Sequence, residues 1–453
     1  MPGNLTLEAL REAVERREID TVMVAAVDMQ GRLMGKRFHA RHFAEHGWHE
    51  THCCDYLLAV DMEMTPVPGY ASANWARGYG DYTVRPDLAT LRRAAWAPGV
   101  ALVLADLIDH HTGEPVAMSP RAILQRQVAR ARAMGFEPMM ATELEFYLFD
   151  NSYESLRGGV AGLVPVSGYN EDYHLFQTAK EEGVMRAVRN GLWESGVHVE
   201  NTKGEAEAGQ HEINIRYSDA LDAADTHAIV KHAIKEIAWG QGRSVTFMAK
   251  YDHRRAGSSA HVHQSLWAGG EPAFLGVGAP HAMAPVMQHF LAGQLAHARE
   301  ITAFLAPYVN SYKRFTVGMF APTKAVWSSD NRTAGFRVVG EGTRGARIEC
   351  RIPGADINPY LALAALLAAG LAGVEARLPL EPEAKGDNYH AEGVREIPRT
   401  LREAADLLDR SAMLRAAFGG DVVDHYVHAA RWEVAEMDRV VTDFELARGF
   451  ERA

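Results

Sequence analysis

Two glutamates placed two residues apart on a predicted strand are the first feature of this sequence that could do chemistry. Residues 141–150 read ATELEFYLFD, and their aromatic and aliphatic content after Gly135 and Pro138 predicts a β-strand. Successive side chains of a strand point to opposite faces, so Glu143 and Glu145 share one face. Adjacent carboxylates repel each other unless a cation lies between them. An edge strand with two solvated glutamates is the other interpretation that this stretch allows.

Three further predicted strands carry ionisable side chains that alternate with apolar ones. They are residues 204–215 (GEAEAGQHEINI) with Glu205 and Glu212, residues 258–266 (SSAHVHQSL) with His261 and His263, and residues 346–353 (ARIECRIP) with Arg347, Glu349 and Arg351. Each pattern alone also fits an ordinary structural role, a partly buried histidine pair or a surface ion network. Together they offer carboxylates, imidazoles and guanidinium groups on the strands of one domain.

This combination of residue types predicts metal-dependent chemistry on an acidic substrate. Carboxylate-dominated sites suit Mg²⁺ and Mn²⁺, and an imidazole shifts the preference towards Mn²⁺. Arginine binds carboxylate or phosphate through two parallel hydrogen bonds. Metal and arginine together are what phosphoryl transfer requires, because positioning and charge neutralisation supply most of that catalysis. The sequence contains no G-x-x-x-x-G-K-[ST] loop, so a P-loop enzyme is excluded.

Composition predicts an ordinary globular protein. The 453 residues are 47% hydrophobic and 23% charged, and the formal net charge of -11 argues against nucleic-acid binding. Three cysteines and the absence of a signal-peptide pattern predict a reducing, cytoplasmic location. The most apolar run, residues 361–374, is too short to span a bilayer, so we expect a buried core helix and no membrane partner.

Periodicity and turn signals predict an α+β chain. Residues 21–28, the turn that follows them and residues 32–37 predict a hairpin in a small first domain, and Ser119-Pro120 predicts a helix that runs to Gly135. Further along, the patterns predict helices at residues 180–194 and 223–239, strands at residues 197–200, 244–250 and 260–266, and a largely helical region from residue 285.

Six motifs in order resemble those of the glutamine synthetase family. They are ELEFYLFD, the E-x(6)-E spacing of GEAEAGQHE, SAHVHQSL, NSYKRF, DNRTAGFRV, and RIECRIP followed by INPYLALAALL. The resemblance covers about residues 141–367 and implies an α+β fold. Residues 1–112 would form a small N-terminal β-grasp domain, and residues 113–453 a large catalytic domain with an antiparallel sheet and flanking helices.

The resemblance also implies roles for particular residues. Two or more Mg²⁺ or Mn²⁺ ions would be held by Glu143, Glu145, Glu205, Glu212, His261 and Glu349. The glutamate substrate would be bound by Arg314, Arg351 and His261, and ATP by His263, Ser265, Arg332, Arg337 and Arg347. The residues expected to act in catalysis are Arg332, Glu145 and Arg351.

The sequence departs from the family where ammonia would bind. A glutamate that closes the ammonium site is replaced by Phe320, in the segment VGMFAP. An aromatic ring offers no charge and no base, and it suits an alkyl group better than a hydrated cation. The aspartate of the family's D-G-S-S segment is also missing, and Glu50 or Asp55 lies near the equivalent place. Phe320, Glu50 and Asp55 are therefore the predicted amine pocket.

These features predict an ATP-dependent ligase that joins the γ-carboxylate of L-glutamate to an organic amine through a γ-glutamyl phosphate. Ethanolamine or a small monoamine is favoured. The alternatives are a polyamine such as putrescine or spermidine, ammonia itself, and a related oligomer without catalysis. A metallohydrolase built on the two histidines of SAHVHQSL is a further alternative. The resemblance also implies a homo-oligomer of stacked hexameric rings, a dodecamer, with active sites between subunits.

Overall fold

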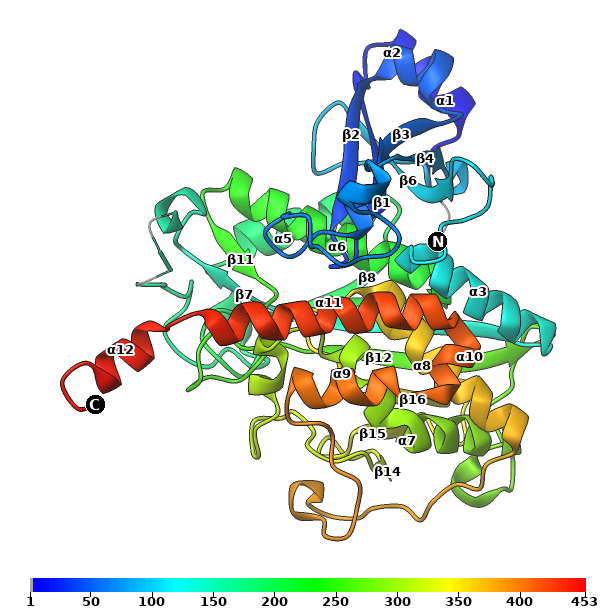
Figure 1. Ribbon diagram of the computed structural model, residues 1–453, viewed down its shortest axis with the longest axis vertical. Helices are drawn as coiled ribbons and strands as arrows, with labels where there is room; N and C mark the ends of the chain where they lie inside the picture. The colour runs from blue at the N-terminus through cyan, green and yellow to red at the C-terminus, as the bar shows by residue number, and fades with distance from the viewer. Residues whose placement is uncertain (1–2, 158, 161) are drawn as a thin grey trace.

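The computed structural model describes residues 3–157, 159–160 and 162–453. These residues form two β-sheets, one from the earlier and one from the later strands of the chain. The first is a six-stranded sheet ordered β2-β1-β6-β4-β3, with β5 paired to β6. Its strands are β1 (Thr21–Val27), β2 (Leu33–His39), β3 (Thr51–Cys54), β4 (Asp81–Pro86), β5 (Arg92–Arg93) and β6 (Val100–Asp109). β1 and β2 form the predicted antiparallel hairpin, and β1 pairs with β6 in parallel. Helix α1 (Leu7–Glu15) lies at the top of this part of the molecule in Figure 1.

The second sheet has ten strands and carries the predicted site. Its central order is β14-β15-β16-β12-β7-β9-β8, with β10 and β11 on β7 and β13 on β12. The strands are β7 (Glu137–Phe149), β8 (Val199–Gly204), β9 (Gln210–Ile215), β10 (Ser218–Asp219), β11 (Ser244–Thr246), β12 (Ala260–Ala268), β13 (Glu271–Pro272), β14 (Trp327–Ser329), β15 (Phe336–Val339) and β16 (Arg347–Cys350). The pairings are antiparallel, as predicted, except that β14 and β15 are parallel.

Alternation along β7 decides which face of this sheet is the chemical one. Leu144 and Phe146 are fully buried in the hydrophobic core, whereas Glu143 and Glu145 project from the other face. Antiparallel pairing then brings other strands into register, because His261 of β12 lies opposite Glu143 and Glu212 of β9 lies opposite Glu145. The predicted strand at residues 141–150 is therefore the central strand of the site.

Helices pack against the sheet and against one another (Figure 1). They are α3 (Pro120–Ala133), α5 (Glu182–Glu194), α6 (Ala220–Gly240), α7 (Pro285–Leu305), α8 (Pro359–Ala376), α9 (Leu401–Asp409), α10 (Ala412–Phe418) and α11 (Gly420–Arg439). Among the described residues, α8 alone is long and apolar enough to cross a membrane, but it is buried and packs against α7, α3 and α6. It is the core helix that its sequence predicts.

The remaining helices are short. They are α2 (Ala40–His42), α4 (Leu175–Thr178) and α12 (Asp443–Gly449), which projects from the body near the C-terminus in Figure 1. The predicted strand at residues 197–200 begins later and runs longer as β8, and the strand predicted at residues 244–250 ends at Thr246. Ser119 precedes α3 as predicted, although its side chain makes no capping hydrogen bond.

A buried arginine connects the first sheet to the helices of the second. Arg121 of α3 donates to Asp87 and Asp106 on one side and to Asp225 of α6 on the other, at 2.6–3.0 Å. The mixed α+β fold is the one expected. The division into domains at residues 112 and 113 stays a prediction.

Candidate functional site

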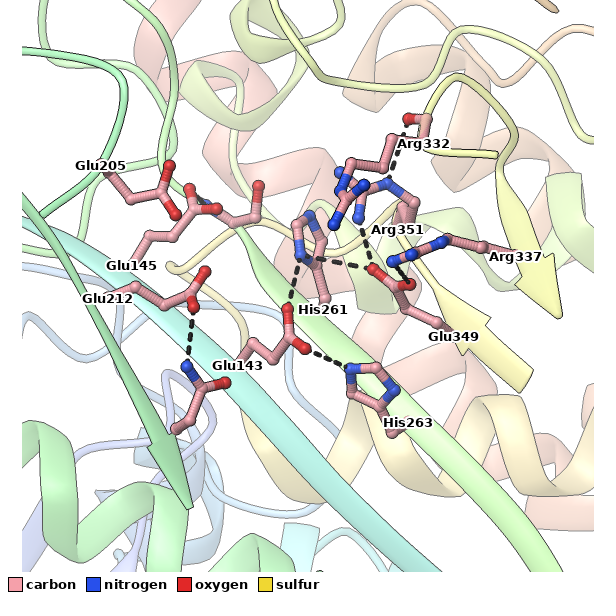
Figure 2. Close-up of polar contacts among 12 residues, drawn as sticks. Glu143, Glu145, Glu205, Glu212, His261, His263, Arg332, Arg337, Glu349 and Arg351 are labelled. Carbon is pink, nitrogen blue, oxygen red and sulfur yellow. Dashed lines mark hydrogen bonds and ion pairs between the residues drawn. The ribbon is translucent and has the colours of Figure 1, made fainter. Parts of the chain in front are cut away.

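Three carboxylates from neighbouring strands converge into one group, called here the Glu145 cluster. Glu145 lies on β7, Glu212 on β9, and Glu205 directly after β8. One oxygen of each lies within 4.8 Å of the others. The β7–β9 register places Glu145 opposite Glu212, and the turn between β8 and β9 brings Glu205 back to them (Figure 2). The family resemblance implied this trio.

A second group, called here the His261 cluster, lies beside the first. Glu143, His261 and Glu349 each offer one ligand atom within 4.8 Å of the others. His261 Nδ1 lies 3.3 Å from Glu143 Oε2 and 3.6 Å from Glu349 Oε1. These side chains come from β7, β12 and β16, which are adjacent in the sheet. The structure therefore brings the side chains of both predicted sets together, and their role as metal ligands stays a prediction.

Electrostatics show that the Glu145 cluster is short of positive charge. Burial together with the charge of Glu205 raises the pKa of Glu145 to about 7. Burial together with the charges of Glu145 and Glu205 raises the pKa of Glu212 to about 9. Lys203, which the sequence analysis missed, forms an ion pair with Glu205. A divalent cation would relieve the remaining repulsion, and an all-carboxylate donor set fits Mg²⁺ or Mn²⁺.

The His261 cluster is electrostatically different, because its groups are already held in their metal-binding protonation states. Burial and the neighbouring Arg351 lower the pKa of His261 to about 4, so its imidazole is neutral. Although burial opposes ionisation, Arg351 and His261 lower the pKa of Glu349 to about 2. Contacts with His261 and His263 outweigh burial and lower the pKa of Glu143 as well. Two carboxylates and one neutral imidazole fit a divalent cation.

Arginines approach the His261 cluster from β15 and from the residue that directly follows β16. Arg351 donates to Glu349 Oε1, and Arg337 donates to Glu349 Oε2 at 3.0 Å. The Arg351 Nε–H donates to the backbone carbonyl of Arg332 at 3.2 Å, which ties the Arg332 loop to the sheet. The side chain of Arg332 is exposed and lines the cleft (Figure 2). This side of the site is built to receive anionic groups.

A cleft of about 640 Å³ connects the two clusters, a volume suited to small-molecule substrates. Its charged lining consists of Glu143, Glu145, Asp172, Glu200, Glu205 and Glu212, with Lys203, Arg332, Arg337 and Arg351. Met319, Phe320 and Tyr173 supply apolar surface. Phe320 is 62% exposed and has a left-handed backbone, with φ of 55°, so its ring is presented at the edge of the cleft.

The predicted ATP residues divide between contact with the clusters and positions beside them. His263 Nε2 lies 2.7 Å from Glu143 Oε1, and Arg347 Nε donates to His263 Nδ1 at 3.0 Å. This network assigns the proton of His263 to Nε2. Ser265 accepts a hydrogen bond from the indole of Trp267, two residues further along β12. His263 and Arg347 therefore position Glu143, and Ser265 lies further along the same strand.

Arg314 differs from the prediction that it faces the substrate. Its side chain is 1% exposed, and its guanidinium donates to the carbonyls of Ile352 and Arg351 and to Ser259 Oγ. Gly257 makes room for it, since a Cβ there would lie 2.7 Å from Arg314 Cγ. In this structure Arg314 supports the backbone that follows β16, at Arg351 and Ile352, and it is not among the residues that line the cleft.

Two of the three predicted amine-pocket residues are also placed elsewhere in the single chain. Asp55 is buried beside the first sheet, where its carboxylate accepts from the Gly80 N–H at 3.1 Å. Glu50 immediately precedes β3 of the same sheet. Neither is among the described residues that line the cleft, whereas Phe320 is. A single chain therefore supplies only the aromatic part of the predicted pocket.

Residues that the sequence did not point to lie on the side of the cleft that holds the Glu145 cluster. Lys203 Nζ lies 4.5 Å from the ring centroid of Tyr173 and 3.4 Å from Asp172 Oδ1. Because Lys203 precedes Glu205 by two residues, period-2 alternation could have placed both side chains on one face. Gln210 donates to Glu145 Oε2 at 3.4 Å. No local pattern would have revealed Tyr173, which comes from a loop.

The raised pKa values lead to a prediction about stability. Folded Glu145 and Glu212 hold protons that the unfolded chain releases near its ordinary pKa of about 4.3, so their stabilising contribution is lost as the pH rises through about 7 and 9. We expect the Tm of metal-free protein to fall by about 2–5 °C over this range, and Mg²⁺ to reverse the fall. Calorimetry of wild type and Glu212→Gln checks this, because the variant should show the smaller pH dependence. A wild-type Tm that changes neither with pH nor on addition of Mg²⁺ would contradict this prediction.

Comparison with known proteins gives one family. The family described as "Glutamine synthetase, catalytic domain" matches residues 117–449. The chain is 48% identical to gamma-glutamylethanolamide synthetase GlnA4 of Streptomyces coelicolor, over 99% of this chain and 96% of that protein. It is 37% identical to glutamate–isopropylamine ligase of a Pseudomonas species, over 97% of this chain and 96% of that protein.

A solved structure agrees with these sequence relatives. The chain superimposes on the structure titled "GmaS/ADP complex-Conformation 1" with a TM-score of 0.84 and 26% identity, covering 97% of this chain and 99% of that one. The likeness therefore extends through both sheets.

Proposed function

Because the chain belongs to the glutamine synthetase family and is an ATP-dependent carboxylate–amine ligase, we propose that its amine substrate is ethanolamine or a small monoamine. The ligase joins the γ-carboxylate of L-glutamate to the amine through a γ-glutamyl phosphate. Phe320 carries the proposal of a small organic amine, since it presents a ring at the cleft where ammonia users of the family carry a glutamate. The names of two relatives, a gamma-glutamylethanolamide synthetase and a glutamate–isopropylamine ligase, support it further.

Arginines supply the electrostatic part of the proposed mechanism. Arg351 binds the carboxylate of glutamate, and Arg314 holds the backbone of Arg351 in place. Arg332 extends into the cleft and stabilises negative charge on the phosphoryl group as it moves from ATP to the γ-carboxylate. Arg337 and Arg347 lie on the neighbouring strands β15 and β16, on the nucleotide side. Activation is required because a free carboxylate is a poor acyl donor to an amine.

Five carboxylates and one imidazole would hold the divalent ions of the proposed mechanism. Glu145, Glu205 and Glu212 would hold one ion, and Glu143, His261 and Glu349 the other. Such ions, when bound, neutralise the charge of phosphate and carboxylate oxygens.

The amine is expected to enter on the side of the cleft that holds the Glu145 cluster. Carboxylates of the Glu145 cluster attract its ammonium group, while Phe320, Met319 and Tyr173 contact its alkyl part. Asp172 and Glu200 also line this side, which favours a polyamine as the second candidate because distal ammonium groups need carboxylates. Asp172, however, is already within ion-pair distance of Lys203.

Phosphate release separates these candidates. Purified protein is assayed with ATP, Mg²⁺ and glutamate against ammonia, ethanolamine, isopropylamine, putrescine and spermidine, and the amide product is identified by mass spectrometry. Strong release with ethanolamine or isopropylamine and little with ammonia is the expected result. A preference for ammonia would overturn the proposal, and a preference for putrescine or spermidine would replace the monoamine with a polyamine.

Phe320 should contribute to amine binding rather than to chemistry. We expect Phe320→Ala to raise the KM for the preferred amine about 10-fold, because burying an alkyl group against the ring contributes about 1–2 kcal/mol. The KM values for ATP and glutamate should stay within about 2-fold of wild type. Steady-state kinetics with each substrate varied in turn checks this, with Phe320→Tyr as the matched control that keeps the ring. An unchanged amine KM in Phe320→Ala would place the amine elsewhere.

We also propose the metal ions, the assembly and the location of the enzyme. Mg²⁺ or Mn²⁺ is the proposed ion, at two or more per site. Stacked hexameric rings would bring Glu50 and Asp55 of one copy to the cleft of the next, which is consistent with their distance from the cleft in one chain. Three unpaired cysteines support a cytoplasmic location. Light scattering of the purified protein tests the assembly.

A further inference from the structure

A third group of ionisable side chains lies away from the cleft. Glu171 and Glu181 are 0% exposed and His211 is 1% exposed, and one ligand atom of each lies within 4.8 Å of the others. His211 Nε2 lies 2.8 Å from Glu181 Oε2 and 4.0 Å from Glu171 Oε2. His211 belongs to β9, whereas the glutamates come from the segment between β7 and α5. We call this group the His211 cluster.

Hydrogen bonding leaves the centre of the His211 cluster unsatisfied. Glu171 uses Oε1 to accept from Ser167 Oγ and the Gly209 N–H, but Glu171 Oε2 has no hydrogen-bond partner. Both oxygens of Glu181 and the Nε2 of His211 lack one too, because their close contact is not aligned as a hydrogen bond. A buried polar atom without a partner costs about 1–3 kcal/mol. All three side chains of this buried group therefore carry at least one unpartnered polar atom.

Charge is equally unbalanced. Among the described residues, no Lys or Arg nitrogen lies within 4.0 Å of the carboxylate of Glu171 or Glu181. Lys180 directly precedes Glu181 in the sequence, but its ammonium group donates to Gln177 Oε1. The ring of Phe146 lies 5.9 Å from that of His211 and closes one side with an apolar surface. Two fully buried carboxyl groups beside a single imidazole must be balanced either by a further cation or by a proton that one of them keeps.

We propose that the His211 cluster binds a structural divalent transition-metal ion, with Zn²⁺ as the best match. Imidazole nitrogens and carboxylate oxygens are both ligands of Zn²⁺, and its bonds to them are about 2.0–2.2 Å long. Two donors at that distance from one ion lie about 3–3.5 Å apart, which falls between the observed separations of 2.8 Å and 4.0 Å. The imidazole favours a transition metal over Mg²⁺.

An ion in this position would stabilise the backbone around the Glu145 cluster from the opposite face of β9. His211 immediately precedes Glu212, and their side chains leave opposite faces of β9. The Glu171 N–H donates to the carbonyl of Glu205 at 3.3 Å. The proposed ion would therefore fix the segment from residue 167 to residue 181 against β9, which carries Glu212, and against the turn that carries Glu205. This role is independent of which amine the enzyme uses.

Metal counting tests the proposal. Full-length protein is loaded with ZnCl₂, dialysed against Mg²⁺ buffer, and its Zn²⁺ content is measured by mass spectrometry. We expect Glu181→Gln to retain one Zn²⁺ per chain fewer than wild type. Glu349→Gln, the matched control in the His261 cluster, should keep the ion that Glu181→Gln loses. The double variant should therefore lose as much Zn²⁺ as the two single variants lose together. Glu171→Gln should behave as Glu181→Gln does.

A second measurement uses the wild-type chain and does not depend on any variant folding. Crystals of the Zn²⁺-loaded protein should show an anomalous difference peak at the zinc edge between Glu171, Glu181 and His211. No peak there in the wild type would overturn the proposal and indicate a shared proton in place of the ion. An equal Zn²⁺ content in wild type and Glu181→Gln would overturn it as well.

Discussion

Glu349→Gln is expected to lower kcat about 10³-fold while the protein remains folded. The substitution keeps the shape of the side chain but removes the charge that joins His261 to two arginines. It removes one of three ligands from the proposed nucleotide-side ion, and it leaves Arg337 and Arg351 without their shared carboxylate. Loss of a single preorganised electrostatic contact at a reacting centre typically costs about 10²–10³-fold, and this residue supports several.

Kinetics, circular dichroism and Mn²⁺ binding together check this prediction. Glu15→Gln, at an exposed position of α1, is the control and should match wild type in all three measurements. Activity within about 10-fold of wild type in Glu349→Gln would contradict the two-ion assignment. Loss of activity with loss of secondary structure would instead show that Glu349 acts mainly through folding.

Alternation and strand register explain why so much of the site could be predicted. Once β7 is recognised as a strand, Glu143 and Glu145 must share a face, and pairing with β9 and β12 has little freedom because Leu144 and Phe146 must stay buried. The metal-ligand sets then follow from which strands are neighbours. The family resemblance supplied those neighbours, which no local pattern could.

The direction of long side chains, and of side chains in loops, could not be predicted in the same way. Arg314 lies in a motif that implies substrate contact, yet its guanidinium is held by backbone carbonyls that only the folded chain brings together. The His211 cluster is a stronger case. Glu171 and Glu181 lie in an irregular segment, and their approach to His211 depends on how that segment packs behind β9. Sequence spacing carries no information about such a contact.

Arg332→Ala should lower kcat by about 10³-fold without affecting the free energy of unfolding. Its side chain is exposed in the cleft, so truncation removes little packing and leaves the backbone contact with Arg351 in place. An arginine that stabilises a transferring phosphoryl group contributes about 10³–10⁵-fold in related chemistry, because the charge develops only in the transition state. The KM for glutamate should therefore change much less than kcat, by about 3-fold or less.

Arg332→Lys separates charge from geometry in this prediction. Lysine keeps the positive charge but cannot offer two parallel N–H groups, so it should recover only part of the lost rate. Steady-state kinetics and calorimetry of both variants check the effect. A rise in the KM for ATP with an unchanged kcat would mean that Arg332 binds the ground-state nucleotide and that another cation, Arg337 or Arg351, stabilises the phosphoryl group. Full activity in Arg332→Lys would show that a point charge is sufficient there.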